Sequence, residues 1–221
     1  MSPRASSRGF ARVVALAALA AAPLLVGAAD DEPVKQPYIE VGDCWSFRGE
    51  NLTHRSPIRE YEECVTFVDR DKDVVFAVAK VKGDDREIDT SYTLSMASRT
   101  NLEGTITTYA KGQEALKWPV RVGDTHTFWS EFRRALLGRN AGKTTWNVRI
   151  VGWEEVTVPA GKFRALKIEG DGVVERYDIR DSFPVKFASW YVPEIGRAVK
   201  SWFQNPDGRR GVELTGFKLN K

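Results

Sequence analysis

The chain has 221 residues, with 33 Lys and Arg, 30 Asp and Glu, and a formal net charge of +3. Residues 1–29 hold three of the basic side chains, Arg4, Arg8 and Arg12, and no acidic one, so residues 30–221 carry 30 basic and 30 acidic groups. This neutral balance gives no support to electrostatic binding of nucleic acid or anionic lipid. The length beyond residue 29 fits one domain with a sizeable core.

The N-terminal segment is typical of a secretory signal. The basic residues precede an apolar run over residues 13–25, and small residues follow at 27–29. This order predicts a signal peptide over residues 1–29, cleaved after Ala28 or Ala29. The alternative is an uncleaved membrane anchor, but the run is rich in alanine, broken by Pro23 and shorter than the roughly 20 apolar residues of a spanning helix. We therefore expect a periplasmic or secreted protein with no membrane span after cleavage.

Residues 30–36 form a polar leader, and a single β-rich domain is predicted over residues 37–221. The two cysteines, Cys44 and Cys64, fall in neighbouring predicted strands. In an exported protein such a pair favours a disulfide, whose closed loop of about 20 residues would contribute about 3 kcal/mol by restricting the unfolded chain. A reactive thiol pair, the alternative, lacks the Cys-x-x-Cys spacing. No cysteine lies near the cleavage site, so a lipid-modified N-terminus is not expected.

Short runs of β-branched and aromatic residues, separated by turn residues, fill the domain. Strands are expected within residues 38–47, 63–68, 73–81, 88–96, 105–109, 125–134, 144–158, 163–169, 173–179, 187–192, 197–203 and 211–219, with a bend near Gly152. Residues 111–117 and 129–137 are the helical alternatives, and residues 51–59 and 138–143 are expected as loops. The pattern predicts an all-β fold: a single curled antiparallel sheet, as a half-barrel or open barrel with little helix.

One phrase occurs twice. Residues 39–47 (IEVGDCWSF) match residues 120–128 (VRVGDTHTF) at Val, Gly, Asp and Phe. The match suggests two pseudo-repeated halves, at about 37–117 and 118–221, which together form one sheet. The alternative is that a Val-Gly-Asp turn followed by an aromatic strand is simply a common combination.

Several candidate reactive motifs do not meet the spacing that their chemistry requires. The two histidines, His54 and His126, are far apart and match no metal-ligand spacing, and no G-x-S-x-G frames a serine nucleophile. Residues 69–73 (DRDKD) resemble the start of a calcium loop but lack its later Gly and Glu, so a solvated hairpin turn is favoured. Residues 138–144 (GRNAGKT) are one residue short of a phosphate-binding loop and precede a strand, not a helix. We predict no catalytic residue, metal site or cofactor.

The aromatic residues are the remaining candidates for a site. Most are expected to pack in the core. The functional alternative is that four of them line the concave side of the curled sheet and hold an apolar ligand: Trp118, Trp190, Tyr191 and Trp202.

Three phrases resemble those of a widespread group of bacterial exported β-rich proteins of uncharacterised function. They lie at residues 117–123 (KWPVRVG), 156–168 (VTVPAGKFRALKI) and 190–200 (WYVPEIGRAVK). The group more often has Trp where this chain has His126. The resemblance implies a curled half-barrel similar to that of envelope proteins such as lipoprotein carriers, and it implies no catalytic residues.

These observations together favour a non-enzymatic cell-envelope protein that carries or binds an apolar or peptide ligand, such as a lipid. The alternative is a structural or interaction module that pairs its sheet surface or edge with another envelope protein. A third alternative is a hydrolase with no recognisable linear motif. The sequence leaves the oligomeric state open.

Overall fold

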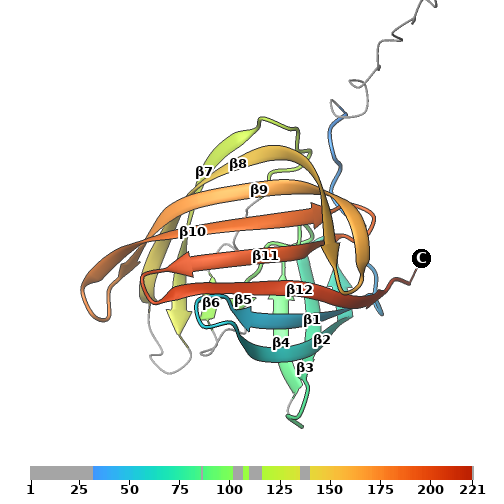
Figure 1. The fold of residues 1–221 in the computed structure, drawn as a ribbon, viewed down its shortest axis with the longest axis horizontal. Helices are drawn as coiled ribbons and strands as arrows, with labels where there is room; N and C mark the ends of the chain where they lie inside the picture. Colours follow the sequence, from blue (N-terminus) through green and yellow to red (C-terminus); the bar gives the residue numbers. More distant parts are fainter. Residues whose placement is uncertain (1–31, 86, 102–106, 110–115, 135–139, 221) are drawn as a thin grey trace, which may run out of the picture.

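The computed structural model describes residues 32–85, 87–101, 107–109, 116–134 and 140–220, and these residues form one antiparallel sheet (Figure 1). The signal peptide lies outside the described residues, as do residues 30 and 31 of the leader. The strands are β1 (Cys44–Asn51), β2 (Ser56–Asp69), β3 (Val74–Val81), β4 (Glu87–Tyr92), β5 (Thr100–Asn101), β6 (Thr107–Tyr109), β7 (Thr125–Arg134), β8 (Asn140–Val158), β9 (Gly161–Arg176), β10 (Asp181–Val192), β11 (Arg197–Asn205) and β12 (Gly208–Lys218).

The sheet has 12 strands in the order β4-β3-β2-β1-β12-β11-β10-β9-β8-β7-β6-β5. Figure 1 shows the long strands β8 and β9 arching over one side, with β10 to β12 and β1 following beside them. The sheet curls without closing, so the prediction of an all-β fold with a single curled antiparallel sheet is confirmed. The described residues contain no helix that is long and apolar enough to cross a membrane.

Some predicted boundaries were wrong. Residues 129–134 belong to β7 and not to a helix, whereas residues 135–137 and most of the alternative helix at 111–117 lie outside the described residues. β2 begins at Ser56, inside the expected loop 51–59, and β8 begins at Asn140, inside the expected loop 138–143. The expected strand over residues 88–96 ends at Tyr92, because the backbone turns before Met96, whose φ is +56°.

The expected break between strands 163–169 and 173–179 was also wrong, because β9 runs from Gly161 to Arg176 across it; residues 177–179 lie in the turn that follows. The glycines at the supposed break serve packing. A Cβ at Gly170 would lie 2.2 Å from the ring of Phe187, and one at Gly172 would lie 2.2 Å from the backbone carbonyl oxygen of Thr145 and 2.8 Å from the ring of Trp146. Gly170 therefore leaves room for the Phe187 ring, and Gly172 leaves room for both the Trp146 ring and the neighbouring backbone.

The two copies of the repeated phrase form the same turn. The glycine has a positive φ in both, +92° at Gly42 and +90° at Gly123, which an L side chain rarely adopts. The following aspartate accepts a hydrogen bond from the backbone N–H of the residue three before it, at 2.9 Å for Asp43 and 2.7 Å for Asp124. Each turn leads into a strand, β1 or β7. Whether the halves are true repeats stays a prediction.

Two clusters of buried side chains lie along the sheet. One surrounds Trp45 and Leu214, and the other surrounds Trp146 and Ile168. Cys44 and Cys64 are direct cross-strand partners on β1 and β2 and are joined by a disulfide, as predicted. The bridge fastens β1, an inner strand of the sheet, to β2.

Candidate functional site

A cavity of about 390 Å³ lies between the two core clusters. Its walls are largely aromatic and aliphatic, with hydroxyl groups and two arginines. The lining residues are Phe47, Tyr61, Ser95, Met96, Ser98, Leu116, Phe128, Trp146, Ile168, Phe187, Ala188, Ser189, Tyr191, Gly196, Arg197, Ala198, Ser201, Trp202, Phe203, Arg210 and Val212. Known ligand pockets measure about 300–1,000 Å³, so this cavity has room for one small ligand.

The aromatic wall follows from the alternation of side chains along the strands. Phe187 on β10 is the direct partner of Phe203 on β11, so both side chains point to the same face. The ring of Trp146 on β8 meets Phe187 edge-on with centroids 5.0 Å apart, and it meets Phe203 at 6.3 Å. These three rings form a continuous apolar surface across β8, β10 and β11.

Two of the four predicted ligand-binding residues lie together on this side. Tyr191 lines the cavity, and Trp118 packs on it with ring centroids 5.4 Å apart. Trp118 is not itself among the lining residues, so its contact with Tyr191 is a packing contact.

Trp190 lies on the opposite face of the sheet. Its indole N–H donates a hydrogen bond to Glu154 at 2.8 Å, and Glu154 forms an ion pair with Lys167 at 3.0 Å. Lys167 and Lys200 are the direct partners of Trp190 on β9 and β11, and its ring also packs against the cluster around Trp45 and Leu214. Consecutive residues of a strand point to opposite faces, which separates Trp190 from Tyr191.

Trp202 borders two hollows. It lines the cavity, and it also lines a polar groove on the outer face with Asn147, Asp171 and Lys186. The guanidinium of Arg209 lies 3.7 Å from the centre of its ring. The structure therefore does not place the four predicted residues along one wall.

Three aromatic side chains near the cavity have polar atoms that are fully buried, so these atoms do not open into it, and they have no partners among the described residues. Tyr191 is 4% exposed and Trp146 is 3% exposed, yet neither the Tyr191 hydroxyl nor the Trp146 indole N–H has a hydrogen-bond partner among the described residues. The same holds for the indole N–H of Trp118. Burial raises the pKa of Tyr191, so its hydroxyl keeps its proton at physiological pH. Buried polar groups are usually paired, so these three need an explanation.

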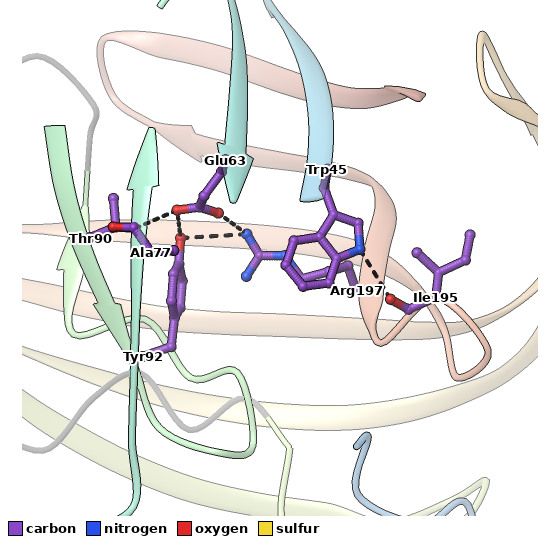
Figure 2. A network of polar contacts seen from close by, with 7 residues as sticks. All are labelled: Trp45, Glu63, Ala77, Thr90, Tyr92, Ile195 and Arg197. Carbon is purple, nitrogen blue, oxygen red and sulfur yellow. Dashed lines mark hydrogen bonds and ion pairs between the residues drawn. The ribbon is translucent and has the colours of Figure 1, made fainter. Parts of the chain in front are cut away.

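A buried ion pair forms another part of the cavity wall. Arg197 on β11 lines the cavity and donates a hydrogen bond to Glu63 on β2, and Figure 2 shows Glu63 bonded to Thr90, Tyr92 and Arg197. The distance from the Thr90 hydroxyl to the carboxylate is 2.6 Å. The side chain of Glu63 is only 1% exposed and that of Arg197 is 12% exposed. The hydrogen-bonding capacity of the carboxylate is therefore used within the protein.

Aromatic rings enclose the guanidinium of Arg197. Its central carbon lies 5.0 Å from the ring centre of Trp45 and 4.7 Å from that of Tyr92. Burial alone would lower the pKa of Arg197, but Tyr92 and Glu63 offset that effect and the pKa lies above its usual value. Burial and the charge of Glu63 raise the pKa of Tyr92. Arg197 therefore stays charged, and its charge is balanced by Glu63.

The sequence reasoning missed Glu63 and Arg197. A signal for Glu63 was available, because it alternates with Tyr61 and Val65 in a strand whose inward positions are otherwise apolar. A charged residue at an inward position needs a partner. No comparable signal identified Arg197 as that partner.

Residues 70–73 form the turn between β2 and β3, where Asp69 accepts the backbone N–H of Lys72 at 3.0 Å. Among the described residues, no group of three or more His, Cys, Asp or Glu side chains could hold a metal ion. His126 stacks on Phe128 with ring centroids 6.1 Å apart. The structure thus places these residues in turn and packing roles.

No protein-family model and no curated protein matches the chain. Its fold is similar to that of a protein from Parabacteroides distasonis ATCC 8503 described as a lipoprotein, with a TM-score of 0.54 and 12% identity over 85% of this chain and 100% of that one. An exported protein with a YmcC-like fold from Bacteroides fragilis NCTC 9343 gives a TM-score of 0.48 and 14% identity over 84% and 99% of the chains. At 12% identity the likeness to the Parabacteroides distasonis protein is one of fold.

Proposed function

We propose that this protein is an exported, non-enzymatic binding module that holds an apolar or amphipathic small molecule in the cavity between its two core clusters. The observation that carries the proposal is the cavity itself, whose largely apolar wall also holds four serines, at positions 95, 98, 189 and 201. An apolar site with a few convergent polar groups is the usual form of a small-molecule site.

Three observations support a location in the cell envelope. Residues 1–29 have the pattern of a signal peptide. The Cys44–Cys64 disulfide suits an oxidising compartment. The similar fold from Parabacteroides distasonis belongs to a protein described as a lipoprotein.

The chemistry of the described lining favours binding over catalysis. Its serines, at positions 95, 98, 189 and 201, have hydroxyl groups, but a hydroxyl nucleophile needs an adjacent base. The described lining holds no Asp, Glu or His, and the nearby Glu63 is bonded to Arg197, Thr90 and Tyr92.

Binding of a fluorescent probe would test the proposal. N-phenyl-1-naphthylamine is uncharged and brightens in apolar sites, so we expect it to bind the purified protein. Ser189→Trp would fill the cavity from β10 and abolish the signal, whereas Lys186→Trp on the exposed face of the same strand would leave it intact. Equal probe binding by Ser189→Trp and the unchanged protein, with both folded, would refute the proposal.

A further inference from the structure

Two serine hydroxyls in the cavity wall are accessible and lack a partner. Ser189 on β10 and Ser201 on β11 are direct cross-strand partners, and both line the cavity. Both side chains are partly exposed, neither hydroxyl is among the buried polar atoms, and neither is bonded to another described residue. The Cβ atoms of such partners lie about 5 Å apart, so one ligand atom can reach both hydroxyls.

An apolar part of the wall lies on one side of this serine pair. Phe187 and Phe203 are each two residues from a serine along its strand, so they point to the same face. The ring of Trp146 meets both phenylalanines, and all three residues line the cavity. This region suits a hydrocarbon segment.

A second apolar part lies on the other side of the pair. Val212 on β12 is the direct partner of Ser201, and Leu214, two residues farther from Phe203, is the partner of Phe47 on β1. Phe47 packs on Tyr61 with ring centroids 5.4 Å apart, and both rings line the cavity. The two hydroxyls therefore lie between two apolar regions.

The chemistry of the pair favours an uncharged polar group. A serine hydroxyl can donate and accept hydrogen bonds, but it carries no charge to balance an ion. Of the two arginines in the lining, Arg197 is already paired with Glu63 and Arg210 is exposed. An ionised group between the apolar regions would lose its hydration, which costs more than two hydroxyl hydrogen bonds return. An ester or amide carbonyl is neutral, and its oxygen has two lone pairs to accept from both hydroxyls.

We infer that the cavity takes a molecule in which an ester or amide carbonyl joins two apolar segments, and that Ser189 and Ser201 donate hydrogen bonds to the carbonyl oxygen. The inference rests on the proposed function and names the ligand class of the same site. The position of the carbonyl is its specific content, because a carbonyl near one end of the molecule would leave one apolar region unfilled.

Two esters of identical composition test where the polar group must lie. Hexyl hexanoate has its carbonyl in the middle of the chain, methyl undecanoate has it near one end, and tridecane has none. Each would displace N-phenyl-1-naphthylamine from the purified protein. We expect hexyl hexanoate to bind about 3- to 10-fold more tightly than methyl undecanoate, the usual effect of one net hydrogen bond.

The double variant Ser189→Ala, Ser201→Ala removes both hydroxyls with little change in shape. It should bind the two esters equally and should bind tridecane at least as tightly as the unchanged protein does. Ser182→Ala, at an exposed serine of β10 outside the lining, is the matched control and should keep the preference for hexyl hexanoate.

The outcomes separate this inference from the proposed function. Equal binding of the two esters by the unchanged protein would overturn the inference, whether or not the variants fold. A preference that persists in the folded double variant would also overturn it, because the serines would then not bind the carbonyl. In both cases the cavity would still bind the probe. Failure of the probe to bind the unchanged protein would refute the proposed function itself.

Discussion

Arg197 and Glu63 lie 134 residues apart in the chain and form an ion pair that is almost closed to solvent. The pair joins β11 to β2 across the concave side of the sheet, and neither strand is the neighbour of the other. A buried ion pair is costly to break, because the partner that remains is a buried, uncompensated charge.

Glu63→Ala should therefore lower the free energy of unfolding by about 3–5 kcal/mol. Glu213→Ala is the control, since Glu213 pairs with Arg48 and Lys200 at the surface and such pairs contribute at most about 1 kcal/mol. Urea unfolding of the two variants measures the difference. Similar losses of stability in the two variants would show that the buried ion pair contributes no more than a surface pair does.

Asp178 should make the stability of the protein depend on pH in a defined direction. The guanidinium of Arg176 bonds both carboxylate oxygens, at 2.7 and 2.5 Å, and lowers the pKa of Asp178 to about 2. An Asp in the unfolded chain has a pKa of about 3.9. As the pH falls, the unfolded state therefore takes up a proton before the folded state does. The stabilisation is complete above about pH 4 and is lost as the pH falls toward 2.

Thermal unfolding of Asp178→Asn at pH 7 and at pH 2 measures this contribution. We expect the variant to be less stable than the unchanged protein at pH 7 and to approach it at pH 2. A constant difference across that range would mean that the carboxylate charge is not the source of the stabilisation.

The disulfide should contribute mainly through the unfolded chain. The bonded cysteines are 20 residues apart, and closing a loop of that length contributes about 3 kcal/mol. We expect the double variant Cys44→Ala, Cys64→Ala to lose about that much in urea unfolding. Reductant should destabilise the unchanged protein and leave the double variant unaffected; sensitivity of both to reductant would point to another cause.

Gly170 links packing in β9 to the cavity. A methyl group at this position would overlap the ring of Phe187, so Gly170→Ala should cost about 1–3 kcal/mol and weaken N-phenyl-1-naphthylamine binding by displacing that ring. Gly216→Ala is the control, because the nearest side-chain atom there is 4.0 Å from the added carbon. Thermal unfolding and probe titration check both effects, and an unchanged Gly170→Ala protein would contradict them.

The variant Trp190→Phe tests whether Trp190 lies on the face of the sheet away from the cavity. Trp190→Phe removes the partly exposed hydrogen bond to Glu154 and part of the packing of the ring on the cluster around Trp45, so stability should fall by about 1 kcal/mol. Probe affinity should be unchanged because the ring lies away from the cavity. A loss of probe binding like that expected for Ser189→Trp would mean that Trp190 belongs to the site after all.

The sequence predicted the fold class and the disulfide, because alternation and cysteine position are local signals. It did not predict which side chains from different strands lie on the same face of the sheet. Adjacent Trp190 and Tyr191 were assigned to one wall, although neighbours in a strand must diverge. The strand was expected to break at residues 170–172, since the role of Gly170 and Gly172 depends on neighbours contributed by β8 and β10. The partner of Glu63 depends on a contact across 134 residues, which no local pattern records.

The pairing of β1 with β12 also determines how the chain can fold. Within the meanders β1–β4 and β7–β12, every other pairing joins strands that are consecutive in the sequence. Each meander can therefore form early. The seam between them brings Cys44 opposite Lys218, and a contact of such long sequence separation is slow to form. Until β1 and β12 pair, each of these two strands is an unpaired edge capable of pairing with other chains. The chain is therefore most exposed to aggregation before the two meanders join.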